Sequence, residues 1–325
     1  MNLLQLQAFL AIYECGAISR AAERERTAPS VLSHHLAKLE SQFPRPLFIR
    51  SPRGLVATEY GERLYLHAQQ IMKAVDDARA DVVNLSGEVA GRVSIGLAYT
   101  TLQAIGPRLM DILFTHYPGI SLMLAETVSG GTISQLLDAE IDLALAYTSS
   151  RDTRLRVTPL LEERLVCIGP PNIVGDPARP IPVAELMKLP FILLRRGTTG
   201  RPIMDDPRLQ RQFEQNAKVH ADNVNAMTHF VLGGHGCVIG TPSYLREHIQ
   251  QGTIVAREIS RPVILRTLYL CEQADKPASR VVQLVRDMLM QLIADEITAG
   301  RWKYERLHFD PSRQYIALPN AKTGV

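Results

Sequence analysis

Apolar positions recur at helical spacing through the first 58 residues and are interrupted by short breaks, which predicts a small helical domain. A first helix is predicted over residues 3–14 and a shorter one over residues 18–24. A third begins after Thr27, which can cap it, and has Pro29 in its first turn, where a missing N–H costs nothing. The second and third helices, joined by a tight break, form a predicted helical hairpin.

The third predicted helix separates apolar from polar residues. Its apolar side carries Ala28, Leu32, Leu36 and Leu39, with Val31 at the flank. The opposite side is small, polar and partly cationic and has no carboxylate; its members are Ser30, Ser33, His34, Ala37 and Lys38. Such a face suits the DNA major groove, which admits an α-helix and is read by side-chain hydrogen bonds. An ordinary hairpin with a solvated face explains the two helices equally well.

Residues 41–57 favour the DNA-binding interpretation. They contain Arg45, Arg50 and Arg53 and no acidic residue. A strand over residues 47–49, a turn over 52–54 and a returning strand over 55–56 predict a small wing. Its arginines are placed to meet phosphates or to enter the minor groove. We therefore expect Ser30, Ser33, His34, Lys38, Arg50 and Arg53 to contact DNA.

A long helix is predicted over residues 59–86, capped by Thr58. Its apolar stripe follows a nearly three-four repeat, at Leu64, Ala68, Ile71, Met72, Val75, Ala78 and Val82. Because the surrounding residues are polar, the stripe needs a partner, and the same helix of a second chain is the simplest one. The alternative, a core helix within one chain, is less favoured because no other helix flanks it in sequence.

Beyond residues 87–91 the pattern changes to strands alternating with helices. Strands are predicted over 92–98, 120–125, 142–147, 164–168, 191–194, 218–221, 237–240, 253–259 and 264–271, and helices over 102–116, 132–139, 205–215, 223–233, 242–249 and 279–298. This β-α-β alternation predicts an α/β fold with a parallel sheet covered on both faces. The strand at 264–271 is expected to return to the first of two α/β lobes.

Composition and charge indicate a soluble globular protein. The chain has 325 residues, 46% apolar and 21% charged, with a net charge of +3, so DNA affinity must come from placed cations and from oligomerisation. The four cysteines are scattered and form no CxxC pair, which fits a reducing cytoplasm. Neither a signal peptide nor an apolar run of the ~20 residues needed to cross a bilayer is present, so a cytoplasmic location is expected.

Enzyme chemistry finds no support in the motifs. The sequence has no G-x-S-x-G, P-loop or HExxH motif and no GxGxxG after a strand, so we expect no catalytic residues and no cofactor. Gly233-Gly234-His235-Gly236 precedes a strand and is typical of a helix stop. His34 and His35 point about 100° apart on a helix and have no third ligand nearby, so no metal site is expected.

Polar residues at strand ends predict a small-molecule site between the lobes. Thr100 and Thr101 follow the first strand, Ser129 precedes the next helix, and Arg195 and Thr198 follow a strand of the second lobe. Hydroxyls and free amides at helix starts suit a small organic anion, and an arginine adds carboxylate recognition. The alternative is that these residues are ordinary loop and helix caps.

The N-terminal 70 residues closely resemble the winged helix-turn-helix domain of LysR-type transcriptional regulators. The matching segments are 6–9 (LQAF), 16–23 (GAISRAAE), 32–33 (LS), 39–40 (LE), 47–50 (LFIR), 53–55 (RGL) and 57–58 (AT). The chain departs from the family pattern at 28–31 (APSV), at His34-His35, where the family has Arg-Gln, and at Pro44, where it has glycine. The resemblance implies a regulator that binds promoter DNA as a dimer of dimers, with residues 59–86 as an antiparallel linker helix.

The rest of the chain resembles, more weakly, the two-lobed periplasmic-binding-protein-like effector domain of the same family. The matching segments are 160–163 (LLEE) and 232–239 (LGGHGCVI). The expected domains are residues 1–58 for DNA binding, 59–90 for dimerisation, 91–300 for the effector and 301–325 as a C-terminal extension. Lobe I would comprise 91–163 and 264–300, and lobe II 164–263. A solute-binding protein with an unrelated helical N-terminal region is the alternative; the Arg-bearing wing and missing export signal argue against it.

Overall fold

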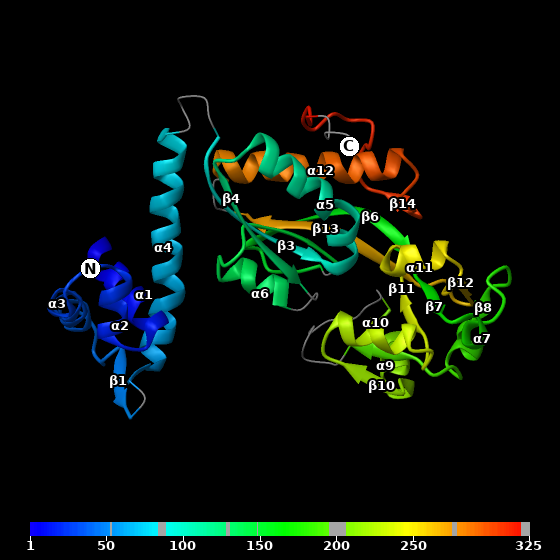
Figure 1. The fold of residues 1–325 in the computed structure, drawn as a ribbon, viewed down its shortest axis with the longest axis horizontal. Coiled ribbons are helices and arrows are strands. Elements are labelled where there is room, and N and C mark those ends of the chain that lie inside the picture. Colours follow the sequence, from blue (N-terminus) through cyan, green and yellow to red (C-terminus); the bar gives the residue numbers. More distant parts are fainter. Residues whose placement is uncertain are drawn as a thin grey trace. The chain divides into compact units, whose positions relative to one another are not determined.

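The computed structural model describes residues 1–52, 54–83, 89–127, 131–147, 149–194, 206–274 and 278–319. The chain divides into two compact units, Met1–Gly91 and Arg92–Val325 (Figure 1). Each unit has a hydrophobic core of its own.

The first unit consists of helices and one β-hairpin. Gln5 and Asn2 cap the first helix reciprocally, and Gly16 ends it in the left-handed region. The Thr58 hydroxyl caps the long helix as predicted, accepting a hydrogen bond from the Gly61 N–H at 3.2 Å. The elements are α1 (Leu3–Cys15), α2 (Ile18–Arg24), α3 (Pro29–Glu40), β1 (Phe48–Ser51), β2 (Gly54–Ala57) and α4 (Glu59–Val83). The predicted end of α4 at Ser86 lies outside the described residues.

The start of α3 differs from the prediction. Pro29 is its first residue, Ala28 is the N-cap, and no hydrogen bond from a described side chain caps it. The Thr27 N–H donates instead to the Ala22 carbonyl at 3.0 Å, so Thr27 belongs to the preceding turn. The prediction of Thr27 as the cap was wrong because Pro29, with its fixed φ and no N–H, takes the first helical position and makes its neighbour the cap. Ala28 is consequently exposed, whereas the three leucines of the apolar side are buried.

The hairpin is held against the turn that follows α1. The Leu55 N–H donates to the Gly16 carbonyl at 2.8 Å. Gly54 has φ +123°, and a Cβ there would lie 2.4 Å from the Gly16 oxygen. A glycine is therefore required at residue 54, both by the backbone conformation and by the close approach of the two chain segments.

The apolar stripe of α4 is partly covered within the chain. Leu64 and Ala68 are buried in the core of the first unit, and Ile71 and Met72 pack against that core. Leu64 and Ala68 therefore need no second chain to cover them, because α1 packs against α4, while pairing of the rest of the stripe with a second chain stays a prediction. The C-terminal part is less covered: Val75 is half-buried, and Ala78 and Val82 are exposed.

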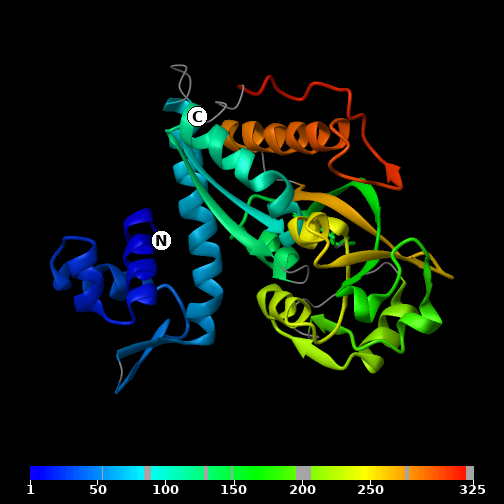
Figure 2. The same ribbon diagram turned by 45° about the vertical axis from the view of Figure 1, so that its right-hand side comes forward.

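The second unit is an α/β structure with two lobes. The elements of lobe I are β3 (Gly91–Ala98), α5 (Tyr99–His116), β4 (Ile120–Thr127), α6 (Gly131–Leu137), β5 (Leu143–Ala146), β6 (Leu155–Arg164), β13 (Leu265–Gln273), α12 (Arg280–Thr298) and β14 (Arg306–Leu307). Helices α5 and α12 pack together over one face of the lobe I sheet, and α6 lies on the other face (Figures 1 and 2).

The lobe I sheet has the strand order β14-β6-β13-β5-β3-β4 among the described residues. β3 and β5 are parallel as predicted, but β13 runs antiparallel to both β5 and β6. The prediction of a parallel sheet was therefore wrong for this half. β6 carries the chain out to lobe II and β13 brings it back, so the two crossing strands must run in opposite directions.

β6 was not predicted as a strand. Its sequence contains Pro159 and a run of charged residues, both unusual in the interior of a sheet. The register with β13 shifts between Leu268 and Tyr269, opposite Leu160, so Pro159 lies beside a bulge where a missing N–H is tolerated.

Lobe II contains mixed sheets around a core that includes Phe191 and Phe213. The strand order is β11-β7-β12-β8, and the β10-β9 pair continues it through a parallel bridge between Phe191 and Cys237. The elements are β7 (Val166–Gly169), α7 (Pro171–Val174), β8 (Ile181–Pro182), α8 (Val183–Leu186), β9 (Ile192–Leu194), α9 (Pro207–Asn216), β10 (Val219–Ala221), α10 (Val224–Leu232), β11 (Val238–Gly240), η2 (Pro242–Leu245), α11 (Arg246–Gln250) and β12 (Val255–Ser260).

The C-terminal extension, to which the sequence assigned no structure, is attached to lobe I. After α12 the chain turns back, and β14 pairs antiparallel with β6 at the edge of the sheet (Figure 1). Trp302 is 5% exposed, and the Tyr315 N–H donates to the Gln291 side chain at 2.9 Å. In the part of the chain that the structure describes, no helix combines the length and the apolar character that a membrane span requires.

Candidate functional site

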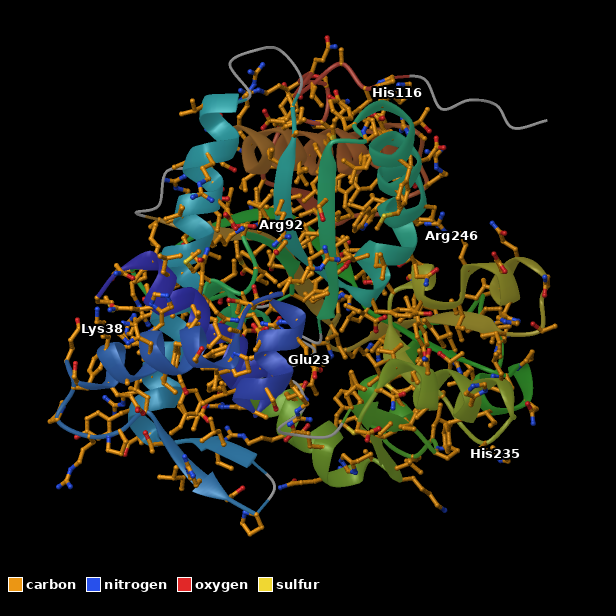
Figure 3. All side chains as sticks on the ribbon, turned by 60° about the vertical axis from the view of Figure 1, so that its left-hand side comes forward. Glu23, Lys38, Arg92, His116, His235 and Arg246 are labelled. Atoms are coloured by element: carbon orange, nitrogen blue, oxygen red, sulfur yellow. The ribbon has the colours of Figure 1, made fainter. Side chains whose placement is uncertain are left out.

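The polar face of α3 points away from the core. Ser30, Ser33, His34 and Lys38 are all exposed, and Lys38 projects outward in Figure 3. The buried leucines of the same helix lie on the opposite side. The structure thus brings these four predicted DNA-contacting residues onto one accessible surface.

A carboxylate at the end of α3 faces the hairpin, not this surface. The Glu40 side chain accepts hydrogen bonds from the backbone N–H groups of Leu47 at 2.7 Å and Phe48 at 3.2 Å. These bonds fix the hairpin relative to α3. Arg50 is exposed on β1, opposite Leu55 of β2. Arg53 lies outside the described residues.

The helices of the first unit are joined to α4 by stacked tyrosines. The rings of Tyr13 and Tyr65 lie 3.8 Å apart at an angle of 14°. The Tyr13 hydroxyl donates to the Glu62 carboxylate. Burial and this hydrogen bond raise the pKa of Tyr13 to about 12, so the hydroxyl keeps its proton and the link persists throughout the physiological pH range. These contacts tie α1 to α4.

In the second unit, two predicted effector residues lie in the first turn of α5. The Thr100 hydroxyl is 3.1 Å from the Tyr147 hydroxyl and accepts a hydrogen bond from Arg266, also at 3.1 Å. Thr101 is fully buried, and its hydroxyl has no hydrogen-bond partner among the described residues. The same is true of Thr132 in the first turn of α6. The other predicted effector residues, Ser129, Arg195 and Thr198, lie outside the described residues.

Arg266 is the centre of a buried polar network that the sequence analysis missed. Its Nε donates to the Glu163 carboxylate at 3.2 Å, and its Nη2 also donates to the Thr241 hydroxyl at 3.1 Å. Its guanidinium carbon lies 3.5 Å from the centre of the Tyr147 ring. Glu163 in turn accepts a hydrogen bond from the Trp302 indole at 2.9 Å. Burial raises the pKa of the Tyr147 hydroxyl, which therefore stays protonated as a hydrogen-bonding group.

This network links four parts of the second unit. Thr100 belongs to lobe I, Thr241 to lobe II, Glu163 and Arg266 to the two crossing strands, and Trp302 to the C-terminal extension. A buried ion pair is stable when further hydrogen bonds satisfy its remaining donors and acceptors, as they do here. The sequence signal was charge interrupting each apolar strand pattern, as the run Glu162-Glu163-Arg164 in LLEER and as the single Arg266 in ILRTLYL.

No cluster of metal-binding side chains occurs among the residues that the structure describes. His34 and His35 have ring centres 6.0 Å apart.

Comparison with known protein families matches both units. Residues 3–62 match the family model described as a bacterial regulatory helix-turn-helix protein of the lysR family. Residues 86–294 match the LysR substrate binding domain.

Individual relatives span nearly the whole chain. The nitrogen assimilation regulatory protein nac of Klebsiella aerogenes is 28% identical over 90% of this chain and 96% of its own. Among solved structures, full-length OxyR from Pseudomonas aeruginosa has a TM-score of 0.64 at 22% identity and covers 89% of this chain and 94% of its own. CbnR, in a complex with its target DNA, has a TM-score of 0.64 at 17% identity, over 92% of this chain and 100% of its own.

Proposed function

This chain belongs to the LysR family of bacterial transcriptional regulators, and on that premise we propose how its residues divide the work. It is a DNA-binding regulator with an effector-binding domain. We propose that residues 1–58 bind the promoter, that residues 59–90 join two chains, and that residues 91–300 bind the effector. The alternative of a solute-binding protein has no support, because the helix-turn-helix match covers residues 3–62.

We assign recognition of the DNA base sequence to the outward face of α3. The observation that carries this proposal is that Ser30, Ser33, His34 and Lys38 are exposed together on a helix face without a carboxylate. Short polar side chains and an imidazole can hydrogen-bond base edges in the major groove. Arg50, which is exposed on β1, and Arg53, which lies three residues later in the sequence, would hold phosphate or enter the minor groove.

Ser33→Ala and His34→Ala are expected to relax sequence preference at separate base positions, each by about 1–3 kcal/mol. Arg50→Met should instead weaken binding to all sequences alike and lower the salt slope by about one. Selection from a random DNA library, followed by anisotropy titrations at several salt concentrations, measures both. Arg63→Met on α4 serves as the control for loss of an exposed arginine. An unchanged sequence preference in both α3 variants would show that this face does not read bases.

The effector is assigned to the helix starts between the lobes, and we propose that it is a small organic anion. The Thr101 and Thr132 hydroxyls are buried without a partner among the described residues, so each would gain a hydrogen bond from a ligand or a water that reaches it. Both lie in the first turns of helices, where backbone N–H groups favour an anion. Thr100, Ser129, Arg195 and Thr198 would complete the site.

Thr101→Val is the sharpest test of this site because it removes the hydroxyl and keeps the shape. We expect the affinity for the effector to fall about ten-fold, as for loss of one hydrogen bond, while the stability of the protein is unchanged or higher. A calorimetric screen of small carboxylates against wild type and Thr101→Val provides the comparison. An anion that binds both proteins equally removes Thr101 from the site, and an effector that is cationic or neutral contradicts the choice of an anion.

The family consists of transcriptional regulators, and we propose that this member has no enzymatic activity and acts in the cytoplasm. We further propose that it works as a dimer of dimers. Effector binding would then bias the arrangement of the lobes and, through α4, the spacing of the DNA-binding heads. Such coupling requires the effector to bind one arrangement more tightly than the other.

A further inference from the structure

A cavity of about 850 Å³ lies in the second unit between lobe II and the C-terminal extension. We call it the extension cavity. One wall consists of residues of β6, β7, η2, α11 and β12 with Thr241, and the other of residues 300–305. Cavities of this size are typical of small-molecule sites in proteins.

The interior of the extension cavity has an apolar side. Val166, Ile249 and Ala256 come from lobe II, and Trp302 comes from the extension. Trp302 is 5% exposed, so only a small part of it reaches the cavity surface, and the hydrogen bond from its indole to Glu163 holds it in place. The half-buried Ile249 and Ala256 supply most of the accessible apolar surface, against which an apolar group of a ligand would pack.

Some of the charged side chains that line the cavity form ion pairs, and others do not. Arg164 binds Glu305 at 2.7 Å, and the cation of Arg301 binds Glu296 outside the cavity at 2.6 Å. Two further cations, Arg246 and Lys303, and one further acid, Glu258, also line the cavity, and none of the three has an ion-pair partner among the described residues. Two uncompensated cations against one carboxylate favour an anionic occupant.

Arg246 and Lys303 belong to opposite walls. Arg246 begins α11 of lobe II (Figure 3), and Lys303 belongs to the extension. The Arg246 guanidinium donates to the Arg301 carbonyl at 3.1 Å, which places it against the extension, and its other donors have no partner among the described residues. A carboxylate between these two side chains would join the two walls by charge-assisted hydrogen bonds.

We propose that the extension cavity is a second ligand site, separate from the interlobe effector site, which takes a small organic anion with a flat apolar body. The carboxylate lies at Arg246 and Lys303, and the apolar body lies against Trp302 and Ile249. Thr241 and Glu163 line the cavity and also contact Arg266, whose other partner is Thr100 of lobe I. An occupant of the cavity therefore touches the network that connects the two lobes.

The probe is naphthalene carboxylate, titrated into the full-length protein labelled with fluorotryptophan. Trp302 is the only tryptophan of the chain, so the label gives a single fluorine resonance from the wall of the cavity. Calorimetry measures the affinity. We expect saturable binding with a shift of this resonance, and much weaker binding of naphthalenemethanol, which has the same rings and no charge.

Arg246→Met and Lys303→Met are each expected to weaken the binding of naphthalene carboxylate by roughly ten-fold to a hundred-fold, as for a lost hydrogen bond to a charged group. Arg179→Met, at an exposed arginine outside the cavity lining, is the matched control and should leave the affinity unchanged. Lys303 is exposed, so its replacement is not expected to impair folding.

Three outcomes overturn the proposal. The first is an absence of saturable binding to the wild type, and the second is equal binding of the acid and the alcohol. The third is binding that falls in Thr101→Val but not in Arg246→Met or Lys303→Met, which would place the probe in the interlobe site alone. None of these outcomes bears on DNA binding by α3.

Discussion

Replacement of Glu163 by glutamine is expected to lower the free energy of unfolding of the second unit by about 3–5 kcal/mol. The Glu163 and Arg266 side chains are only 4% and 10% exposed, so the variant leaves a buried guanidinium without its counter-charge. Glutamine retains an oxygen that can accept the Trp302 indole hydrogen bond, so the loss reports mainly on the charge. Urea unfolding followed by the emission of Trp302, the only tryptophan, measures the second unit specifically.

Glu305→Gln is the matched control for Glu163→Gln. Its carboxylate also binds an arginine, Arg164, at 2.7 Å, but these side chains are 42% and 35% exposed. Solvent screens such a pair, so the control should cost at most about 1 kcal/mol. The double variant Glu163→Gln with Arg266→Met should recover much of the loss, because no buried charge remains. Equal stabilities of Glu163→Gln and Glu305→Gln would show that the ion pair does not hold the lobe junction together.

Val82→Glu is expected to convert the protein to monomers in solution and to lower operator affinity by about 10²–10⁴-fold, the gain that bivalent binding provides. Val82 is 69% exposed in the uncovered part of the α4 stripe. If a second chain covers this part, a carboxylate there would have to be buried without a partner. A monomer carries one DNA-binding domain, so it could no longer bind both half-sites of the operator at once.

Sedimentation velocity and titration of a selected operator fragment measure the two effects of Val82→Glu. Gln70→Glu introduces the same charge into the same helix, about 120° around from Leu64 on the stripe, and should leave both unchanged. Leu64 is unsuitable for this test. It is buried in the core of the first unit, and its replacement by glutamate would unfold that unit. A Val82→Glu protein that remains dimeric would exclude this part of α4 from the interface.

The sequence by itself determined the local elements of the first unit. Apolar residues at helical spacing specify α1 to α4, and Gly54 specifies the hairpin turn because its backbone has a positive φ. Each of these signals acts over one or two helical turns, so it can be read without knowledge of distant residues. The exposure of Ser33, His34 and Lys38 followed in the same way, because a helix with one buried side must expose the other.

Only the tertiary structure decided how distant segments pair. The direction of β13 and the existence of β6 depend on the chain leaving lobe I and returning to it, which no local pattern records. The partial burial of the α4 stripe depends on α1 packing against it. The low β-strand propensity of proline would also exclude Pro159 from a strand. The bulge between β6 and β13 leaves room for a residue without an N–H at this position.

The polar network and the extension are the clearest cases of tertiary control. A buried glutamate and a buried arginine on two strands, 103 residues apart in the chain, are each unfavourable in isolation. Their burial becomes possible only when Thr100, Thr241 and Trp302 supply the remaining hydrogen bonds. The sequence supplies these groups one at a time. Whether a buried charge is satisfied depends on all of its neighbours at once, and the fold alone brings them together.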